Sequence, residues 1–230
     1  MAGAPAQARP AVSGLRGLSV LVLGLLPTPA AASPWEAPDG GQTIVQVWVG
    51  DEEGRPETEA QFYREARGPF GTQVTKFWAQ DDSLGRTFEA SVALRRSSSV
   101  PLADVAAVEA GVIAIAREGL DPGFGAEARV SAGWTWGPGL YAVADLAGRA
   151  EEEGVSPRWG ATLGRSDARS LAFVQVRYEE GPPGRGFERA EAALVWFGDR
   201  PWGVQIGVRA GLAHDEQAFT IGLWRRPGGP

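Results

Sequence analysis

The stretch GVQIGVRAGL, residues 203–212, alternates apolar side chains with glycine and polar side chains. Successive side chains of a β-strand point to opposite faces, so Val204, Ile206 and Val208 share one face, and Gln205 and Arg209 share the other. Soluble sheets and membrane barrels both use this period. The pattern therefore predicts a strand, and the rest of the chain must decide which face meets water.

The N-terminus reads as an export signal. Arg9 and Arg16 precede the apolar run GLSVLVLGLLPTPAAAS, which ends in the small residues 30–32 before Ser33. Pro27 and Pro29 end the run well short of the roughly 20 apolar residues that a membrane-spanning helix needs. We therefore predict a signal peptide at 1–32, a short leader at 33–42, a β-barrel at 43–225 and a flexible tail at 226–230.

Composition narrows the function classes. The formal net charge of −6 argues against nucleic-acid binding, and the absence of cysteine excludes disulfides and thiolate metal sites. We find no phosphate-binding glycine loop, zinc spacing or calcium-loop pattern, so we expect no cofactor and no metal. With 32 glycines and 17 prolines in 230 residues, the chain favours turns and close packing over long helices.

Period-two runs between turn residues predict about twelve strands of about ten residues, close to the 9–11 residues of a tilted membrane-spanning strand. The predicted ranges are 43–50, 57–67, 71–80, 86–96, 103–117, 126–136, 139–148, 157–165, 168–179, 187–197, 202–212 and 217–225.

Two of these segments also fit a helix. Residues 56–67 begin with proline and are rich in Glu and Ala, and residues 101–118 place apolar side chains on one helical stripe. A helix at either place would leave eleven strands and break an even-numbered barrel.

Connections of two kinds are predicted to alternate along the chain. Short turns at 137–139, 165–169 and 198–201 contrast with longer, more acidic segments at 118–125, 148–157 and 179–186. Short turns at one end and long loops at the other are typical of outer-membrane barrels.

The two faces of the predicted strands differ in a way that favours lipid outside. The apolar faces carry no charge except at Arg64, as lipid requires, because an outward Arg or Lys costs about 2–4 kcal/mol at the bilayer midplane. The other faces set Gly beside long charged side chains, which fits a narrow lumen. We assign these residues to the lumen: Arg95, Arg117, Arg129, Arg177, Arg189, Arg209, Glu89, Glu109, Asp145, Glu191 and Gln205.

Tryptophan recurs near the predicted strand ends. Aromatic side chains with one polar atom favour the lipid headgroup layer, so we expect an aromatic girdle at both membrane boundaries. The residues assigned to this girdle are Trp48, Trp78, Trp134, Trp136, Trp159, Trp196, Trp202 and Trp224.

Residues 43–225 resemble bacterial outer-membrane β-barrel proteins as a class. The resemblance rests on the signal peptide, the alternating strands, the turn pattern and the final strand AFTIGLW, although RRPGGP follows Trp224 where such proteins usually end on an aromatic residue. It implies an all-β, antiparallel, up-and-down transmembrane barrel in the outer membrane, in contact with outer-membrane lipid. The size is also similar to that of small twelve-stranded channels with arginine-lined pores for acidic oligosaccharides.

The first functional hypothesis is therefore a non-enzymatic, porin-like channel, or a structural barrel, with arginines that favour small acidic solutes. The second is a soluble exported β-sandwich or small barrel, periplasmic or secreted, that binds a ligand such as a carbohydrate. The third is a membrane-embedded hydrolase with His214, the only histidine, as base.

Overall fold

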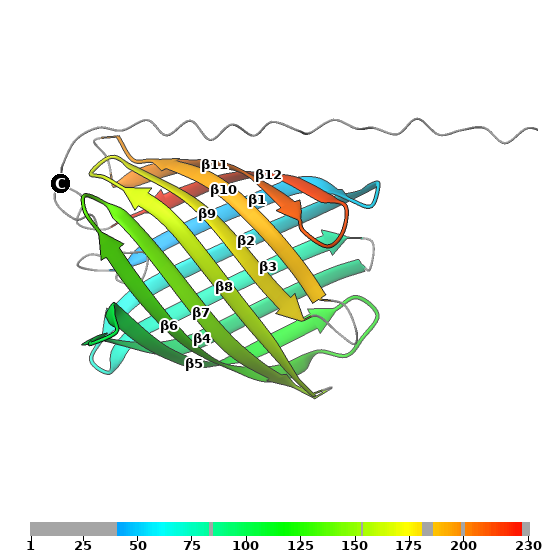
Figure 1. Cartoon of the computed structure of the whole chain (residues 1–230). Coiled ribbons are helices and arrows are strands. Elements are labelled where there is room, and N and C mark those ends of the chain that lie inside the picture. The colour runs from blue at the N-terminus through cyan, green and yellow to red at the C-terminus, as the bar shows by residue number, and fades with distance from the viewer. Residues whose placement is uncertain (1–40, 83–84, 153, 181–185, 199–200, 227–230) are drawn as a thin grey trace, which may run out of the picture.

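The computed structural model describes residues 41–82, 85–152, 154–180, 186–198 and 201–226, in which twelve strands form a closed antiparallel barrel (Figure 1). Within these ranges no helix is long and apolar enough to cross a membrane. The strands are β1 (Gln42–Glu52), β2 (Arg55–Gly68), β3 (Gly71–Asp82), β4 (Gly85–Val100), β5 (Ala103–Arg117), β6 (Gly123–Trp136), β7 (Leu140–Glu151), β8 (Gly154–Ser166), β9 (Ser170–Glu180), β10 (Gly186–Trp196), β11 (Trp202–Gly211) and β12 (Glu216–Arg225).

The barrel closes because the first and last strands pair. Thr43 lies opposite Arg225, and Glu52 lies opposite Glu216, while every other strand pairs with its neighbours in the chain. Closure satisfies the backbone N–H and C=O groups of both edge strands, which is the condition for a sheet to exist in lipid. We call the end where β1 begins and β12 ends the terminal end, and the other the opposite end.

The predicted fold class is confirmed, and the largest error in a strand boundary is four residues, at the end of β4. The helical alternative for 56–67 and 101–118 is wrong, because these residues form β2 and β5. Glu and Ala favour helices in isolation, but pairing with neighbouring strands on both sides overrides that preference.

The expected contrast between short turns and long loops is not found. All connections contain two to five residues at both ends, because the strands continue into the segments predicted as loops at 118–125, 148–157 and 179–186. The β1–β2 connection shows how tight the turns are: Glu53 and Gly54 have φ values of 53° and 80°. Positive φ at both central residues defines the hairpin turn that matches strand twist.

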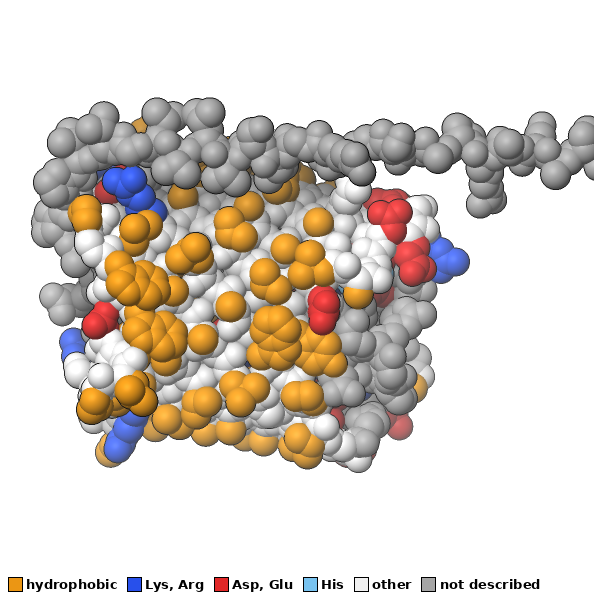
Figure 2. Space-filling model, in the orientation of Figure 1, with side chains coloured by type: hydrophobic (Ala, Val, Ile, Leu, Met, Phe, Trp, Pro, Cys, Tyr) orange, Lys and Arg blue, Asp and Glu red, His pale blue; other side chains and the backbone are white. Residues whose placement is uncertain are grey.

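The apolar face of the strands is the outer one. In β11, Val204, Ile206 and Val208 are about half exposed, whereas Gln205 is fully buried and Arg209 nearly so. Figure 2 shows apolar side chains over the middle of the barrel surface and charged side chains mainly towards its two ends. Apolar side chains lie outside and polar side chains inside, which is the reverse of the distribution in a soluble protein. The hypothesis of a soluble sandwich or small barrel is therefore wrong.

The predicted signal peptide at 1–32, most of the leader and the last four residues lie outside the described residues. The signal peptide and the domain boundaries at both ends stay predictions.

Candidate functional site: the barrel interior

The barrel interior holds the charged side chains. All residues that the sequence assigns to the lumen lie on the inward face of their strands. For most of them burial alternates with exposed neighbours, and Arg177 and Arg189 share the face of the buried Glu191 through the β9–β10 register. Arg95, Glu109, Glu191, Gln205 and Arg209 are among the most buried polar residues of the chain. The interior is therefore polar over much of its length, as in outer-membrane barrels.

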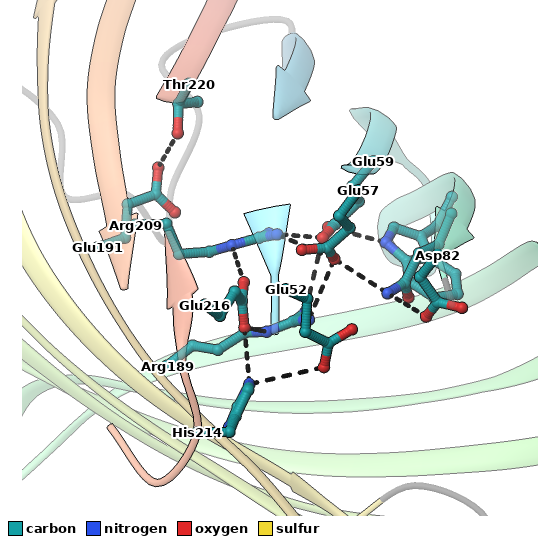
Figure 3. A network of polar contacts seen from close by, with 12 residues as sticks. Glu52, Glu57, Glu59, Asp82, Arg189, Glu191, Arg209, His214, Glu216 and Thr220 are labelled. Atoms are coloured by element: carbon teal, nitrogen blue, oxygen red, sulfur yellow. Dashed lines mark hydrogen bonds and ion pairs between the residues drawn. The ribbon is translucent and has the colours of Figure 1, made fainter. Parts of the chain in front are cut away.

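A first group of ion pairs, which we call the Glu57 cluster, lies near the opposite end and joins β2, β10, β11 and β12 (Figure 3). Arg189 and Arg209 each bind a different oxygen of Glu216 at 2.7 Å, and both lie 3.3 Å from Glu57 Oε1. Arg209 also pairs with Glu59. Because β2 and β10 are separated by three strands on the barrel wall, these contacts cross the interior. The cluster comprises Glu52, Glu57, Glu59, Arg189, Arg209, His214 and Glu216.

A second group, the Arg95 cluster, extends from β2 to β7. Arg95 donates to Glu109 at 2.6 and 3.0 Å and also pairs with Glu65, whose carboxylate accepts a hydrogen bond from Tyr63. Lys76 lies 3.0 Å from Glu109 and 4.0 Å from a carboxylate oxygen of β6. The cluster comprises Tyr63, Glu65, Lys76, Arg95, Glu109, Glu127, Arg129 and Asp145.

A third, smaller group lies between β4, β5 and β7. Arg149 donates to Glu89 at 2.7 Å, although two strands separate them on the wall. Arg117 donates to Glu151 at 2.7 Å, and Glu151 also pairs with Arg149. The Arg149–Glu89 and Arg117–Glu151 pairs thus link strands that are not neighbours in the sheet.

The arginines do not form an unpaired cationic row. In the ion pairs of the described interior, eight cations meet ten carboxylates, so negative charge compensates them. Arg177 differs, because it is exposed and forms no ion pair with any residue that the structure describes. The cations are Lys76, Arg95, Arg117, Arg129, Arg149, Arg158, Arg189 and Arg209; the carboxylates are Glu57, Glu59, Glu65, Glu89, Glu109, Glu127, Asp145, Glu151, Glu179 and Glu216.

The interior at the terminal end is apolar on one side. We call this group the Trp224 cluster: Tyr141, Val143, Leu171, Val195, Phe197 and Trp224, with Ile44 and Phe173 against it. The rings of Phe197 and Trp224 meet edge to face at 6.5 Å. Glycines on neighbouring strands make room for the rings, because a Cβ at Gly164 would overlap Tyr141 and one at Gly203 would overlap Phe197.

Three of the eight tryptophans assigned to the girdle face the interior instead. Trp48 is buried under the guanidinium of Arg209 at 5.4 Å, Trp78 donates to Glu59 at 2.8 Å, and Trp224 donates to Gln205 at 2.5 Å. The indole N–H groups of Trp78 and Trp224 find their acceptors in the polar lumen, so these two residues do not need the headgroup layer for a hydrogen bond. Outward-facing positions belong to Trp134, Trp136, Trp159, Trp196 and Trp202.

Ten of the eighteen ion-paired residues named above were not assigned to the lumen from the sequence. They are Lys76, Arg149, Arg158, Glu57, Glu59, Glu65, Glu127, Glu151, Glu179 and Glu216. The alternation in 57–65, with Glu57, Glu59 and Glu65 on one face, carries the signal, but the helical alternative for this segment concealed it. Cross-barrel partners have no signal in a single sequence, because strand tilt and stagger decide them.

His214 lies in the β11–β12 turn, where its Nε2 is 2.9 Å from Glu216 and 3.9 Å from Glu52. This nitrogen therefore contacts the carboxylates of the Glu57 cluster. The hydrolase hypothesis stays a prediction, and a measurement of lipid hydrolysis by His214→Ala would test it. In the described part of the chain, no group of three or more His, Cys, Asp or Glu is arranged to hold a metal ion.

Comparison with known proteins gives structural neighbours only. No protein-family model and no curated protein matches the sequence. Among solved structures, the KdgM porin is 10% identical, with a TM-score of 0.56 over 80% of this chain and 98% of that chain. The KdgM porin in complex with disordered oligogalacturonate is 8% identical with a TM-score of 0.59 over 80% and 98%. The NanC porin is 11% identical with a TM-score of 0.53 over 79% and 98%.

The chain therefore has the fold of bacterial outer-membrane β-barrel porins. Its apolar outer belt, closed sheet and polar interior are the properties that let a β-sheet span a membrane. On these physical grounds the barrel is built to span a membrane, and its fold is that of outer-membrane porins.

Proposed function

We propose that this protein is a narrow, porin-type channel for small polar solutes. The observation that carries the proposal is the set of ion pairs that cross the interior, because each joins charged groups from strands that are not neighbours in the sheet. A purely structural barrel has no need of them, since burying a charge is costly and apolar side chains fill a core as well.

Side-chain rearrangement is the step that would admit a solute. The backbone hydrogen bonds of the closed sheet do not depend on the interior side chains. Arginine and glutamate side chains can therefore exchange their partners for water or solute without unfolding of the wall. Conduction by this route would be small, because the pairs occupy the lumen until they are displaced.

Acidic solutes are the finer part of the proposal. Arg177 is an exposed inward cation without an ion pair to any described residue, so a passing carboxylate would meet it without first displacing a protein carboxylate. One structural neighbour is described as a complex with oligogalacturonate, which supports acidic solutes for that protein. Because carboxylates balance the other arginines, we expect a weak preference for anions rather than a strong one.

A filled structural barrel is the second candidate, and the Trp224 cluster favours it. Its side chains are almost completely buried, and they close part of the terminal end. In this case the charged clusters would stiffen the wall without opening.

Planar-bilayer recording separates the two candidates. We expect single-channel steps from the wild-type barrel, and a reversal potential across a KCl gradient that moves towards cation preference in Arg177→Gln. Arg96→Gln is the matched control, because Arg96 faces outward and donates to the Phe70 carbonyl at 3.1 Å. Absence of conductance from folded protein would select the filled barrel, and an unchanged reversal potential would reject the role of Arg177.

A further inference from the structure

Arg64 is a charged side chain on the apolar outer face, and the channel proposal gives it no role. It lies on β2, four residues before that strand ends at the terminal end, and it is exposed. An arginine facing lipid is costly unless its guanidinium reaches the headgroup layer or meets an anion. The position therefore calls for a partner outside the protein.

A second outward arginine lies close to the first. Thr43 of β1 pairs with Arg64 on one side and with Arg225 of β12 on the other. Neighbouring strands are about 4.8 Å apart, so the two arginine Cα atoms are about 10 Å apart on the same face. Neither arginine forms an ion pair within the described chain. Two guanidinium groups at this spacing fit one phosphodiester between them.

An aromatic ring marks this row as a membrane boundary. Trp202 pairs with Arg225, whose guanidinium carbon is 5.7 Å from the centre of the indole ring. Tryptophan at a strand end on the outer face is typical of the headgroup layer. The row from Trp202 through Arg225 and Thr43 to Arg64 thus offers cations at the depth where lipid phosphates lie.

An apolar groove begins beside the arginines. It has a volume of about 480 Å³, and its lining includes Val45, two residues from Thr43, and Phe62, two residues from Arg64. Five alanines of its lining have small side chains, and we call them its floor. Phe62, Phe77 and Phe88 are among the larger side chains of the lining. The floor residues are Ala60, Ala79, Ala90, Ala114 and Ala116.

We propose that this surface is a binding site for one anionic phospholipid. The phosphate lies between Arg64 and Arg225, and the Thr43 hydroxyl offers a further donor. An acyl chain lies in the alanine-floored groove. Charge selects the headgroup and the groove selects a hydrocarbon chain, so the site requires both parts of the same molecule.

Native mass spectrometry of the folded barrel in detergent tests the proposal. The probes are phosphatidylglycerol and phosphatidylcholine with the same acyl chains. We expect the wild type to retain phosphatidylglycerol, with a preference that falls about tenfold or more in the double variant Arg64→Gln, Arg225→Gln. Arg86→Gln is the matched control, because Arg86 faces outward at the opposite end, 3.5 Å from Asp81. It should keep the wild-type preference.

A groove variant separates a lipid site from simple charge attraction. Ala79→Leu fills the floor, and we expect it to weaken retention of phosphatidylglycerol several-fold while the arginines stay in place. Equal retention of the two lipids by the wild type, or full preference in the double arginine variant, would overturn the proposal. If the arginine variant loses binding but Ala79→Leu binds phosphatidylglycerol as the wild type does, the groove is not the acyl-chain part of the site.

Discussion

The two parts of the barrel interior solve the same packing problem in opposite ways. Near the opposite end, the Glu57 cluster places charges that pair with one another across the barrel. At the terminal end, the Trp224 cluster fills one side with rings and aliphatic chains. The stability of the charged part depends on every ion having its partner, because loss of one partner leaves a buried charge without compensation. The stability of the apolar part depends on how completely its side chains fill the available volume.

The largest expected effect comes from breaking the charged part. Arg209→Ala leaves Glu57, Glu59 and Glu216 with one cation fewer, and we expect the free energy of unfolding to fall by about 3–5 kcal/mol. Urea unfolding of the barrel in lipid vesicles, followed by circular dichroism, measures it. Arg177→Ala is the control and should change stability by less than about 1 kcal/mol. Equal effects of the two substitutions would show that the cluster is not a unit.

A cavity in the apolar part should cost somewhat less. Leu171 is 2% exposed within the Trp224 cluster, and Leu171→Ala should lower the free energy of unfolding by about 2–4 kcal/mol. Leu194→Ala is matched in residue type, but Leu194 faces outward, so its effect should be smaller. The same urea experiment compares them. A larger loss for Leu194 would mean that the lipid face, not the interior cluster, holds this wall.

The close packing of Gly164 against the Tyr141 ring is expected to have a third, smaller effect on the free energy of unfolding. Gly164→Ala places a methyl group against Tyr141, and we expect a loss of about 1–3 kcal/mol from overpacking. In a Tyr141→Ala background the same substitution should cost much less, because the ring is gone. A double-mutant cycle of unfolding free energies measures the coupling. Additive losses would contradict a direct contact.

The sequence predicts the wall well because the wall is built on local periodicity. In β12, Phe219, Ile221 and Leu223 are exposed and Thr220 and Trp224 are buried, as strict alternation requires. Lipid reinforces this signal, because a one-residue slip would turn Thr220 outward and Phe219 and Ile221 inward. The inward direction of the lumen residues follows from the same argument.

The contacts inside the lumen could not be predicted in the same way. The pairs Arg149–Glu89 and Arg189–Glu57 depend on barrel stagger, which a single sequence does not encode locally. The tryptophans were misassigned for a related reason. Trp48 and Trp78 obey the inward register of their strands, but the expectation of a girdle was based on position along the strand and ignored the face.

The smallest effect concerns the β8–β9 turn, beside Leu171. Burial alone would raise the pKa of Asp167, but hydrogen bonds from the Arg169 and Ser170 amides and the Ser170 hydroxyl lower that pKa below 3.8. The ionised carboxylate thus stabilises the fold above about pH 4, and this contribution is lost as the pH falls through the lowered pKa. Asp167→Asn should be less stable by under about 1 kcal/mol at pH 7. Urea unfolding should show the gap from the wild type shrinking below pH 4, and a constant gap would refute the assignment.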